Sequence, residues 1–392
     1  MNHALKSIEY YRGREQTYLK HFFLERYLER VAYNIGWFTD EFVYVDGFSG
    51  PWKSQDEALQ DTSFMIAIAR LRMVLSGLAK VARYPKVRCL FIEEEEIPYR
   101  ALKRAVESIT DIKCEPLKGR FEQLIPRIHK FIGTAFSLVF IDPTGWTGFG
   151  LRRIAPLLQH RPGEVIVNFM FDHINRFLDD QRSELSPSFD DLFGGTGWES
   201  TVKATCRREE AIIELYRSRM RSIGGFDYTT STRILNPTRD RTYFHLVYGT
   251  RNPKGLIEFR KVEEAAVSEQ ERVRFDAKEA SRLERTGQPL LLPPSELAIG
   301  PTALDIERTL RLSEADEKLR KQLDQHGQIA YDFALALALE TPLVFERDVK
   351  AMVSRFEQTS YLHIKGLKGK QRVPQYGQGH VLVRNTHISP VC

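Results

Sequence analysis

Apolar residues recur along the chain in two rhythms, one typical of helices and one typical of buried strands. Residues 14–32 place aromatic and aliphatic side chains at helical spacing, which predicts an amphipathic helix. Strand-like runs then alternate with helical stretches; they read EFVYVD, VRCLFIEEEE, IKCEPLK, AFSLVFIDP and GEVIVNFMF. This alternation predicts an α/β fold, a Rossmann-like doubly wound sheet whose central strands are parallel and buried.

The second half of the chain changes character several times. Residues 178–206 are rich in Asp, Ser and Gly and look like an insertion. The stretch RTYFHLVYGTRNPKGLIEFRKVE alternates apolar and polar residues around Asn-Pro-Lys-Gly, which predicts an antiparallel hairpin. The Pro-rich span 286–302 predicts a linker between a first domain, 1–285, and a small second domain, 303–392. Two helices, QIAYDFALALALE and FERDVKAMVSRFEQ, and a basic hairpin give the second domain the order of a winged helix.

Composition excludes several classes of protein. The 392 residues are 42% hydrophobic and 28% charged, as in an ordinary globular protein. No apolar run reaches the roughly 18 residues of a membrane span, and the N-terminus has no secretory pattern. The four cysteines form no C-x-x-C pair, which argues against structural zinc and favours a reducing, cytoplasmic setting. The net charge of +5 is mild, but residues 358–392 hold five Lys or Arg and no acid.

Polar motifs follow several of the predicted strands. Asp46 precedes a Gly-Phe-Ser-Gly loop, Glu93 ends the second strand, and IDPTGW ends the fourth. Ligands of open α/β sheets bind beyond the carboxyl ends of the strands, where strand order reverses. Each motif also has a purely structural interpretation: a tight turn, a solvated helix start, or a Pro-initiated loop. Because all of them fall at one edge of one sheet, a binding site is favoured.

The spacing of these motifs discriminates between cofactors. Asp46 and Glu93 lie farther apart than the roughly 20 residues of a dinucleotide fold, and the glycines do not follow G-x-G-x-x-G. A nicotinamide cofactor is therefore disfavoured. An acid at the tip of the second strand suits ribose hydroxyls, so S-adenosylmethionine fits better than NAD. No metal-ligand spacing stands out, which makes a metal-dependent nuclease a weaker alternative.

The order of VDGFSGP, FIEE and FIDPTG resembles class I methyltransferases of the D-P-P-Y type, which act on exocyclic amines of nucleobases. The early TYLKHFFLERYL is similar to the N-terminal motif of rRNA adenine-N6 methyltransferases. With VIVNFMFDHINRF and FHLVYGTRNPKGL, most of residues 10–260 resembles the three-Cys-motif partner proteins, bacterial proteins often associated with mobile elements. That resemblance implies a partner protein bearing a three-cysteine motif.

The resemblance implies roles for individual residues. The cofactor would be held by Asp46, Gly47, Phe48, Ser49, Gly50 and Glu93, and Lys20 and His21 would lie near its methionine carboxylate or near the target base. The target amine would be held by Asp142 and the Pro143 carbonyl, and two acceptors would orient this poor nucleophile. Thr144 and Gly145 replace the second Pro and the aromatic residue of the motif. Trp146 follows, either to stack on a flipped-out base or as ordinary core.

Two functions from different classes remain. The first is an S-adenosylmethionine-dependent methyltransferase acting on a nucleic-acid base, DNA or RNA, with adenine N6 as the expected target. The second is a non-catalytic partner that uses the same fold as a binding module. For the C-terminal hairpin, nucleic acid is slightly favoured over protein contact, because every charge on it is positive. Its candidate phosphate contacts are Lys365, Lys368, Lys370 and Arg372.

Overall fold

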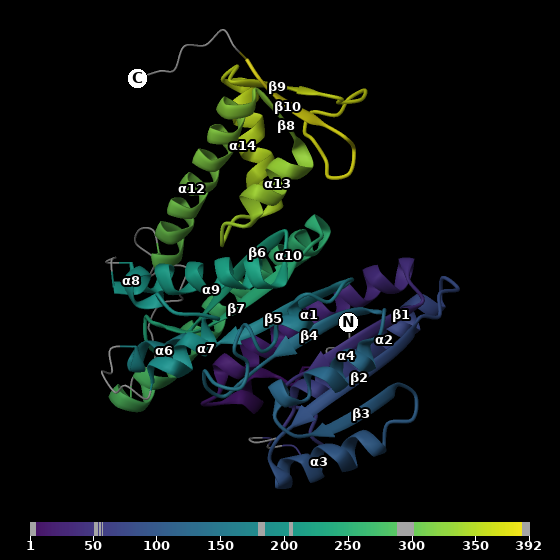
Figure 1. The fold of residues 1–392 in the computed structure, drawn as a ribbon. Helices are drawn as coiled ribbons and strands as arrows, with labels where there is room; N and C mark the ends of the chain where they lie inside the picture. The colour runs from purple at the N-terminus through teal and green to yellow at the C-terminus, as the bar shows by residue number, and fades with distance from the viewer. Residues whose placement is uncertain are drawn as a thin grey trace. The chain divides into compact units, whose positions relative to one another are not determined.

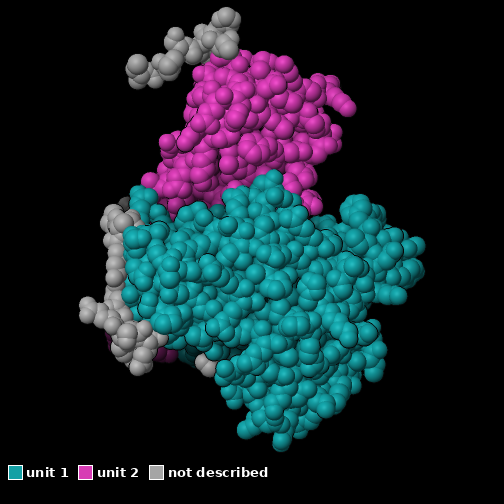
Figure 2. Space-filling view, in the orientation of Figure 1, with its two compact units in different colours: residues 1–251, 266–281 teal, residues 252–265, 282–392 magenta. Residues whose placement is uncertain are grey.

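The computed structural model describes residues 5–50, 54, 56, 58–178, 185–203, 207–287 and 302–385. The chain forms two compact units, which Figure 2 colours separately. Unit 1 comprises residues 1–251 and 266–281, and unit 2 comprises residues 252–265 and 282–392. None of the described helices is long and apolar enough to cross a membrane.

Unit 1 is built around a seven-stranded sheet (Figure 1). Its strands are β1 Glu41–Asp46, β2 Lys86–Glu93, β3 Lys113–Lys118, β4 Phe136–Ile141, β5 Gly163–Phe169, β6 Tyr228–Leu235 and β7 Thr242–Thr250. They lie in the order β3-β2-β1-β4-β5-β7-β6. The first five pair in parallel, whereas β7 runs antiparallel to both β5 and β6. Chain order reverses between β1 and β4, which is the switch point of a doubly wound sheet.

This strand order, with one antiparallel strand inserted near the edge, is that of a Rossmann-like methyltransferase fold. The predicted fold class is therefore confirmed, including the five parallel strands and the presence of an antiparallel hairpin. The central strands are almost wholly buried, with the last five residues of both β1 and β4 inaccessible to water. Burial on both faces explains why their sequences are continuously apolar rather than alternating.

Helices cover both faces of the sheet (Figure 1). The helices of the first 286 residues are α1 Glu15–Phe38, α2 Ser63–Ala79, α3 Glu96–Glu107, α4 Ile125–Ile132, α5 Ala155–Leu158, α6 Phe171–Phe177, α7 Ser186–Leu192, α8 Trp198–Lys203, α9 Arg208–Gly224 and α10 Pro253–Thr286. On one face α1 packs beside α2, and Tyr27 of α1 donates to Glu164 of β5 at 2.6 Å. On the other face, Val43 and Val45 of β1 join an apolar cluster with residues of α4, α5 and α9.

The antiparallel hairpin is not where the sequence pattern placed it. It consists of β6 and β7, joined by residues 236–241. The predicted turn, Asn-Pro-Lys-Gly, instead begins α10: the Asn252 side chain accepts from the Lys254 amide at 2.9 Å, and Pro253 is the first helical residue. Asn before Pro serves a helix start as well as a turn, because Pro has no N–H to lose at the first helical position. The interpretation of Asn-Pro-Lys-Gly as a hairpin turn was therefore wrong.

Unit 2 contains a small three-stranded antiparallel sheet of order β8-β10-β9. Its elements after the predicted linker are α12 Ala303–His326, β8 Gln328–Ala330, α13 Tyr331–Leu339, α14 Glu346–Gln358, β9 Leu362–Lys365 and β10 Val381–Arg384. The two predicted helices and the hairpin are present. The sequence pattern missed α12 and β8. Thr302 begins α12 with a reciprocal capping box to Asp305.

Two predicted connecting segments fall partly outside the described residues. Of the predicted linker 286–302, residues 288–301 lie outside them, as do residues 179–184 and 204–206 of the predicted insertion. The described part of the insertion forms α7 and α8 and contributes Phe189, Leu192 and Trp198 to the apolar core of unit 1. This part of the segment is therefore folded into the sheet's covering layer.

Candidate cofactor site

Three of the predicted acidic residues meet at the carboxyl edge of the sheet. Asp46 ends β1, Glu93 ends β2, and Asp142 directly follows β4. Asp46 pairs in register with Phe91 of β2 and Phe140 of β4. Side chains two residues apart on a strand share a face, so Glu93 and Asp142 project from the same face as Asp46. The switch point between β1 and β4 is therefore lined by carboxylates.

Asp46 is fully buried and held by two donors. Its carboxylate accepts from the Ser63 hydroxyl at 2.6 Å and from the Phe48 amide at 3.1 Å. Burial raises the pKa of Asp46 to about 6; the hydrogen bond from Ser63 opposes this shift, and the charge of Asp142 adds to it. Ser63 is the first residue of α2, whose N-cap Thr62 accepts from the Met65 amide. The helix start thus fixes the hydroxyl against Asp46.

The loop after β1 is fastened to both neighbouring strands. The Gly47 amide donates to the Phe140 carbonyl of β4 at 2.9 Å, and the Ser49 amide donates to the Ile92 carbonyl of β2 at 2.7 Å. The Ser49 hydroxyl donates a hydrogen bond to the Asp46 backbone carbonyl at 3.0 Å. Gly50, the last described residue of this loop segment, is half-buried. The amides of residues 47–49 are therefore used within the protein, and they set the shape of the loop.

Gly47 has a packing role that the sequence did not reveal. A Cβ atom built on it would lie 2.8 Å from the ring of Phe121, which begins a short 3-10 helix, Phe121–Gln123. The Phe48 ring also packs on Phe121, with centroids 5.5 Å apart. The absence of a side chain at Gly47 lets this aromatic ring close one side of the loop.

Replacing Gly47 with Ala is expected to lower the free energy of unfolding by about 1–3 kcal/mol, the usual cost of overpacking a close contact. The measurement is urea unfolding followed by tryptophan fluorescence. Adding Phe121→Leu should recover part of the loss, because a smaller side chain vacates the space that the new methyl group needs. If the double variant is no more stable than Gly47→Ala alone, the contact with Phe121 is not the reason for glycine.

Glu93 is buried at the tip of β2, where its Oε1 accepts from the Glu95 amide at 2.7 Å. The acids that follow it are exposed: Glu94 pairs with Arg120 at 2.7 Å, and Glu96 pairs with Arg100 at 2.6 Å at the start of α3. The acidic run therefore divides into one buried carboxylate and a solvated helix start. Only Glu93 contributes to the inner edge.

Asp142 is engaged by two side chains. Lys20 of α1 approaches its Oδ2 at 2.5 Å, and Asn168 of β5 donates to its Oδ1 at 2.6 Å. Asn168 is buried, and its own Oδ1 has no hydrogen-bond partner among the described residues. A buried acceptor without a partner, beside the Asp142 carboxylate, is a position where a donor of a ligand would be favourable. Asn168 and Ser63 were not predicted from the sequence, although an Asn in the otherwise apolar strand VIVNF is an unusual buried polar residue.

The adjacent pair Lys20 and His21 divides between two environments. His21 is buried, and its Nδ1 lies 3.1 Å from the Tyr11 hydroxyl. Burial lowers the pKa of His21 well below its ordinary value, and the charge of Lys20 adds to the effect, so its ring is neutral. Of the two predicted residues, Lys20 is the one that contacts the acidic edge.

The residues that follow Asp142 also lie in different environments. Pro143 is buried, Thr144 is exposed, and Trp146 is half-buried. The Trp146 ring stacks on Phe189 with centroids 5.4 Å apart, and its Nε1 donates to Ser188 at 3.0 Å. The structure thus places Trp146 in an aromatic cluster with α7, while Asp142 remains at the sheet edge.

The predicted phosphate contacts lie on the hairpin of unit 2. Lys365 ends β9, and the other three lie in the loop before β10; all four are exposed, the loop residues being Lys368, Lys370 and Arg372. Within the described chain none of the four has an acidic partner. The cations of α14 are paired instead: Arg347 with Glu264 at 2.9 Å and Lys350 with Glu346 at 2.7 Å, while Arg355 pairs with Asp316. The uncompensated positive charge is on the hairpin rather than on the helix.

Among the described residues, no group of three or more His, Cys, Asp or Glu side chains is arranged so that it could hold a metal ion.

No protein-family model matches the chain, and no curated protein matches it. A solved structure from Legionella pneumophila str. Philadelphia 1, assigned to family model DUF519, aligns with a TM-score of 0.38 and 12% identity, over 63% of this chain and 89% of its own. A loganic acid methyltransferase with SAH aligns with a TM-score of 0.29 and 8% identity, over 71% and 91%. Likenesses this distant carry no argument about function. The resemblances to three-Cys-motif partner proteins and adenine-N6 methyltransferases stay predictions.

Proposed function

We propose that unit 1 binds S-adenosylmethionine at the carboxyl ends of β1, β2 and β4 and transfers its methyl group to an exocyclic amine of a nucleic-acid base. The observation that carries this proposal is the gathering of Asp46, Glu93 and Asp142 on one face of the sheet at the switch point. Ligands of doubly wound folds bind at such a point. A buried carboxylate with a raised pKa in this position supports a functional site.

The residues at this edge fit such a cofactor. Of the three carboxylates at this edge, Asp142 is paired with Lys20, and no ion pair is seen for Asp46 within the described chain, so the edge suits a ligand that carries a sulfonium and an ammonium group. Glu93 would accept hydrogen bonds from the ribose hydroxyls. Asp46 would act through the loop: its carboxylate and carbonyl hold Phe48 and Ser49 in place. When bound, the cofactor supplies an electrophilic methyl group.

Asp142 would orient the target amine. Each carboxylate oxygen has more than one acceptor direction, so Asp142 can accept an amine hydrogen while Lys20 and Asn168 hold it. The Pro143 carbonyl would accept the second hydrogen, which turns the nitrogen lone pair toward the methyl group. A purine amine such as adenine N6 meets these requirements. Asp142 would accept the proton that the amine loses after transfer.

Unit 2 would recruit the nucleic acid. Its order of helices and its three-stranded sheet suit a winged helix, and its hairpin carries Lys365, Lys368, Lys370 and Arg372 without acidic partners in the described chain. Cations in this state attract phosphates and release counterions on binding. A separate protein bearing a three-cysteine motif remains part of the proposal as a partner.

A second candidate function is a non-catalytic binding module on the same fold. Two observations favour it: both oxygens of Asp142 already have partners, and Trp146 is committed to its aromatic cluster and to Ser188. In this case the cofactor would act as a signal rather than as a reactant. The two candidates share the binding step and differ in methyl transfer.

Calorimetric titration of S-adenosylmethionine separates these functions from a bare scaffold. The parent protein is expected to bind, and Glu93→Gln is expected to weaken binding about tenfold to a hundredfold, because a charged acceptor is lost. The matched control is Glu164→Gln. Glu164 is also a buried acid, but it lies at the start of β5, away from the carboxyl edge of the sheet, so this variant should leave the affinity for S-adenosylmethionine unchanged.

A titration of the parent protein without heat would overturn the cofactor proposal. Binding without transfer of a labelled methyl group to DNA or RNA would favour the non-catalytic module. Transfer that is lost in Asp142→Asn, with cofactor binding retained, would support the enzyme.

A further inference from the structure

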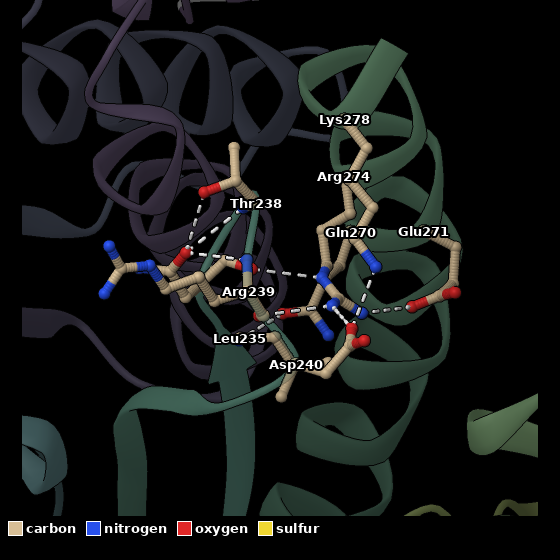
Figure 3. Close-up of polar contacts among 9 residues, drawn as sticks. Leu235, Thr238, Arg239, Asp240, Gln270, Glu271, Arg274 and Lys278 are labelled. Atoms are coloured by element: carbon tan, nitrogen blue, oxygen red, sulfur yellow. Dashed lines mark hydrogen bonds and ion pairs between the residues drawn. The ribbon is translucent and has the colours of Figure 1, made fainter. Parts of the chain in front are cut away.

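The loop between β6 and β7 is fastened to α10 by several polar contacts (Figure 3). Gln270 accepts from the Leu235 amide at 2.8 Å. Arg274 donates to the Asn236 carbonyl at 3.1 Å and pairs with Asp240, which also pairs with Lys278 at 2.8 Å. Every one of these anchoring side chains comes from one helix. The loop conformation is therefore fixed from the side of α10.

Two of the side chains that anchor the loop are polar and buried. Burying them is costly unless their hydrogen bonds to the loop are kept, so these bonds favour a single loop conformation. Gln270 and Arg274 are both buried, and buried polar groups are tolerated only when hydrogen-bonded. Within the loop, the Asn236 side chain accepts from the Thr238 and Arg239 amides at 3.1 and 3.0 Å. The loop is thus held at both its backbone and its side chains.

The same loop lies at the carboxyl edge of the sheet. Both β5 and β6 run antiparallel to β7, so they are parallel to each other, and the end of β6 lies at the same edge as the end of β5. Asn168 of the candidate site is near that end of β5. Arg241 of the loop pairs at 3.2 Å with Asp172, which lies in the first turn of α6, directly after β5. The loop therefore borders the side of the edge where Asp142 is held.

This border carries more positive than negative charge. Arg176 of α6 and Arg241 share the single carboxylate of Asp172. Arg239 is exposed, and its guanidinium has no partner within the described part of the chain. Figure 3 shows the Arg239 side chain extending from the loop away from α10. Arg176 and Arg241 thus pair with one carboxylate, and the unpaired Arg239 lies two positions before Arg241 in a loop whose conformation is fixed by α10. The other carboxylate of the loop, Asp240, is already paired with Arg274 and Lys278.

We propose that Arg176, Arg239 and Arg241, the arginine cluster, bind a backbone phosphate of the nucleic acid whose base enters the site at Asp142. The guanidinium fork matches phosphate geometry, and a fixed loop loses little freedom on binding. The inference rests on the proposed nucleic-acid substrate and adds a phosphate contact on unit 1 to the contacts proposed for the hairpin of unit 2. The cluster would position the strand next to its target base.

The test is fluorescence anisotropy with a short labelled single-stranded DNA and the RNA of the same sequence, at several salt concentrations. Arg239→Gln is expected to weaken binding several-fold and to reduce the slope of log K against log salt by about 0.7, the value for one phosphate on a single strand. The triple variant R176Q/R239Q/R241Q should lose roughly tenfold or more. Arg104→Gln, an exposed arginine on α3, is the charge-matched control.

The outcomes separate this inference from the proposed function. If Arg239→Gln and the triple variant bind like Arg104→Gln while a variant of the four hairpin cations loses binding, the cluster proposal fails and the nucleic-acid substrate stands. If the parent protein binds neither strand, both fail, while the cofactor titration still reports on the site. Thermal midpoints within a degree or two of the parent protein show that the variants fold. An equal loss from Arg104→Gln would mean that only net charge matters, which also overturns the cluster.

Discussion

Replacing Asp46 with Asn is expected to make the protein more stable at neutral pH while weakening its binding of S-adenosylmethionine. The pKa of Asp46 is raised to about 6 by burial, so the folded protein holds a proton that the unfolded chain has released from about pH 4 upward. Stability from this group is therefore lost as pH rises between about 4 and 6, by about 2–3 kcal/mol in total. Asn keeps the shape and has no charge to bury.

Urea unfolding between pH 4 and pH 8 measures this effect through tryptophan fluorescence. All four tryptophans lie within residues 1–251, so the signal reports on unit 1. The stability difference between Asp46→Asn and the parent protein should grow with pH up to about 6 and then level off. Ser63→Ala is the companion variant: it removes a hydrogen bond that favours the ionised carboxylate, so it should raise the pKa further and destabilise. A difference that does not vary with pH would contradict the assignment.

A gain in stability together with a loss of binding would indicate that Asp46 is kept for ligand binding at a cost to the stability of the fold. Most buried substitutions in a core destabilise, whereas groups kept for function are often held at a cost to the fold. Asp46 is a candidate for such a group, because its carboxylate orders Phe48 and lies near Asp142. A variant that gained stability and kept full affinity would show that the charge is dispensable for the ligand.

The largest loss of stability is expected from Arg260→Met in unit 2. Arg260 and Glu263 are both buried and pair at 2.5 Å, and Arg260 also donates to the Leu339 carbonyl at 2.7 Å. Removing the cation leaves Glu263 as a buried charge without its guanidinium, which typically costs about 3–5 kcal/mol. The contact of Arg260 with Leu339, the last residue of α13, would also be lost.

The double variant R260M/E263Q provides the control, because it removes both charges. It should recover a large part of the loss, since the two residues act as a coupled pair. Unit 2 has no tryptophan, so far-UV circular dichroism must follow its unfolding while fluorescence follows unit 1. A double variant as unstable as Arg260→Met would place the cost in the lost contact with the Leu339 carbonyl instead.

Much of the sheet could be predicted from sequence, because its strands are buried on both faces and are therefore continuously apolar. The five parallel strands and the acids at their ends follow from local pattern plus the rule that parallel strands end at one edge. The hairpin was misplaced because Asn-Pro serves both turns and helix starts, and only the packing of Leu256 and Phe259 in a helix decides between them. Helix α12 was missed because three of its twenty-four residues are buried, so its pattern is weak.

The candidate site shows the same division. Acids at strand tips could be found one strand at a time, whereas the partners of those acids come from distant segments. Lys20 reaches Asp142 across 122 positions, and Ser63 reaches Asp46 only because α2 begins beside β1. Trp146 could not be assigned to a substrate or to the core, since its neighbours Phe189 and Ser188 belong to a segment that resembled an insertion. Contacts between segments that are distant in the sequence decide such roles, and these contacts cannot be predicted from a single sequence.

The division of α10 between the two units has a consequence for how the gene can recombine. Its residues 253–265 belong to unit 2 and its residues 266–281 to unit 1, within one uninterrupted helix. A gene cut once between residues 253 and 281 therefore cannot deliver either unit whole. Recombination that exchanges one unit must bring both segments or rebuild a helix junction without changing its phase. We expect homologous chains to keep the two units together, and the spacing between Asn252 and Gly287 to tolerate insertions poorly.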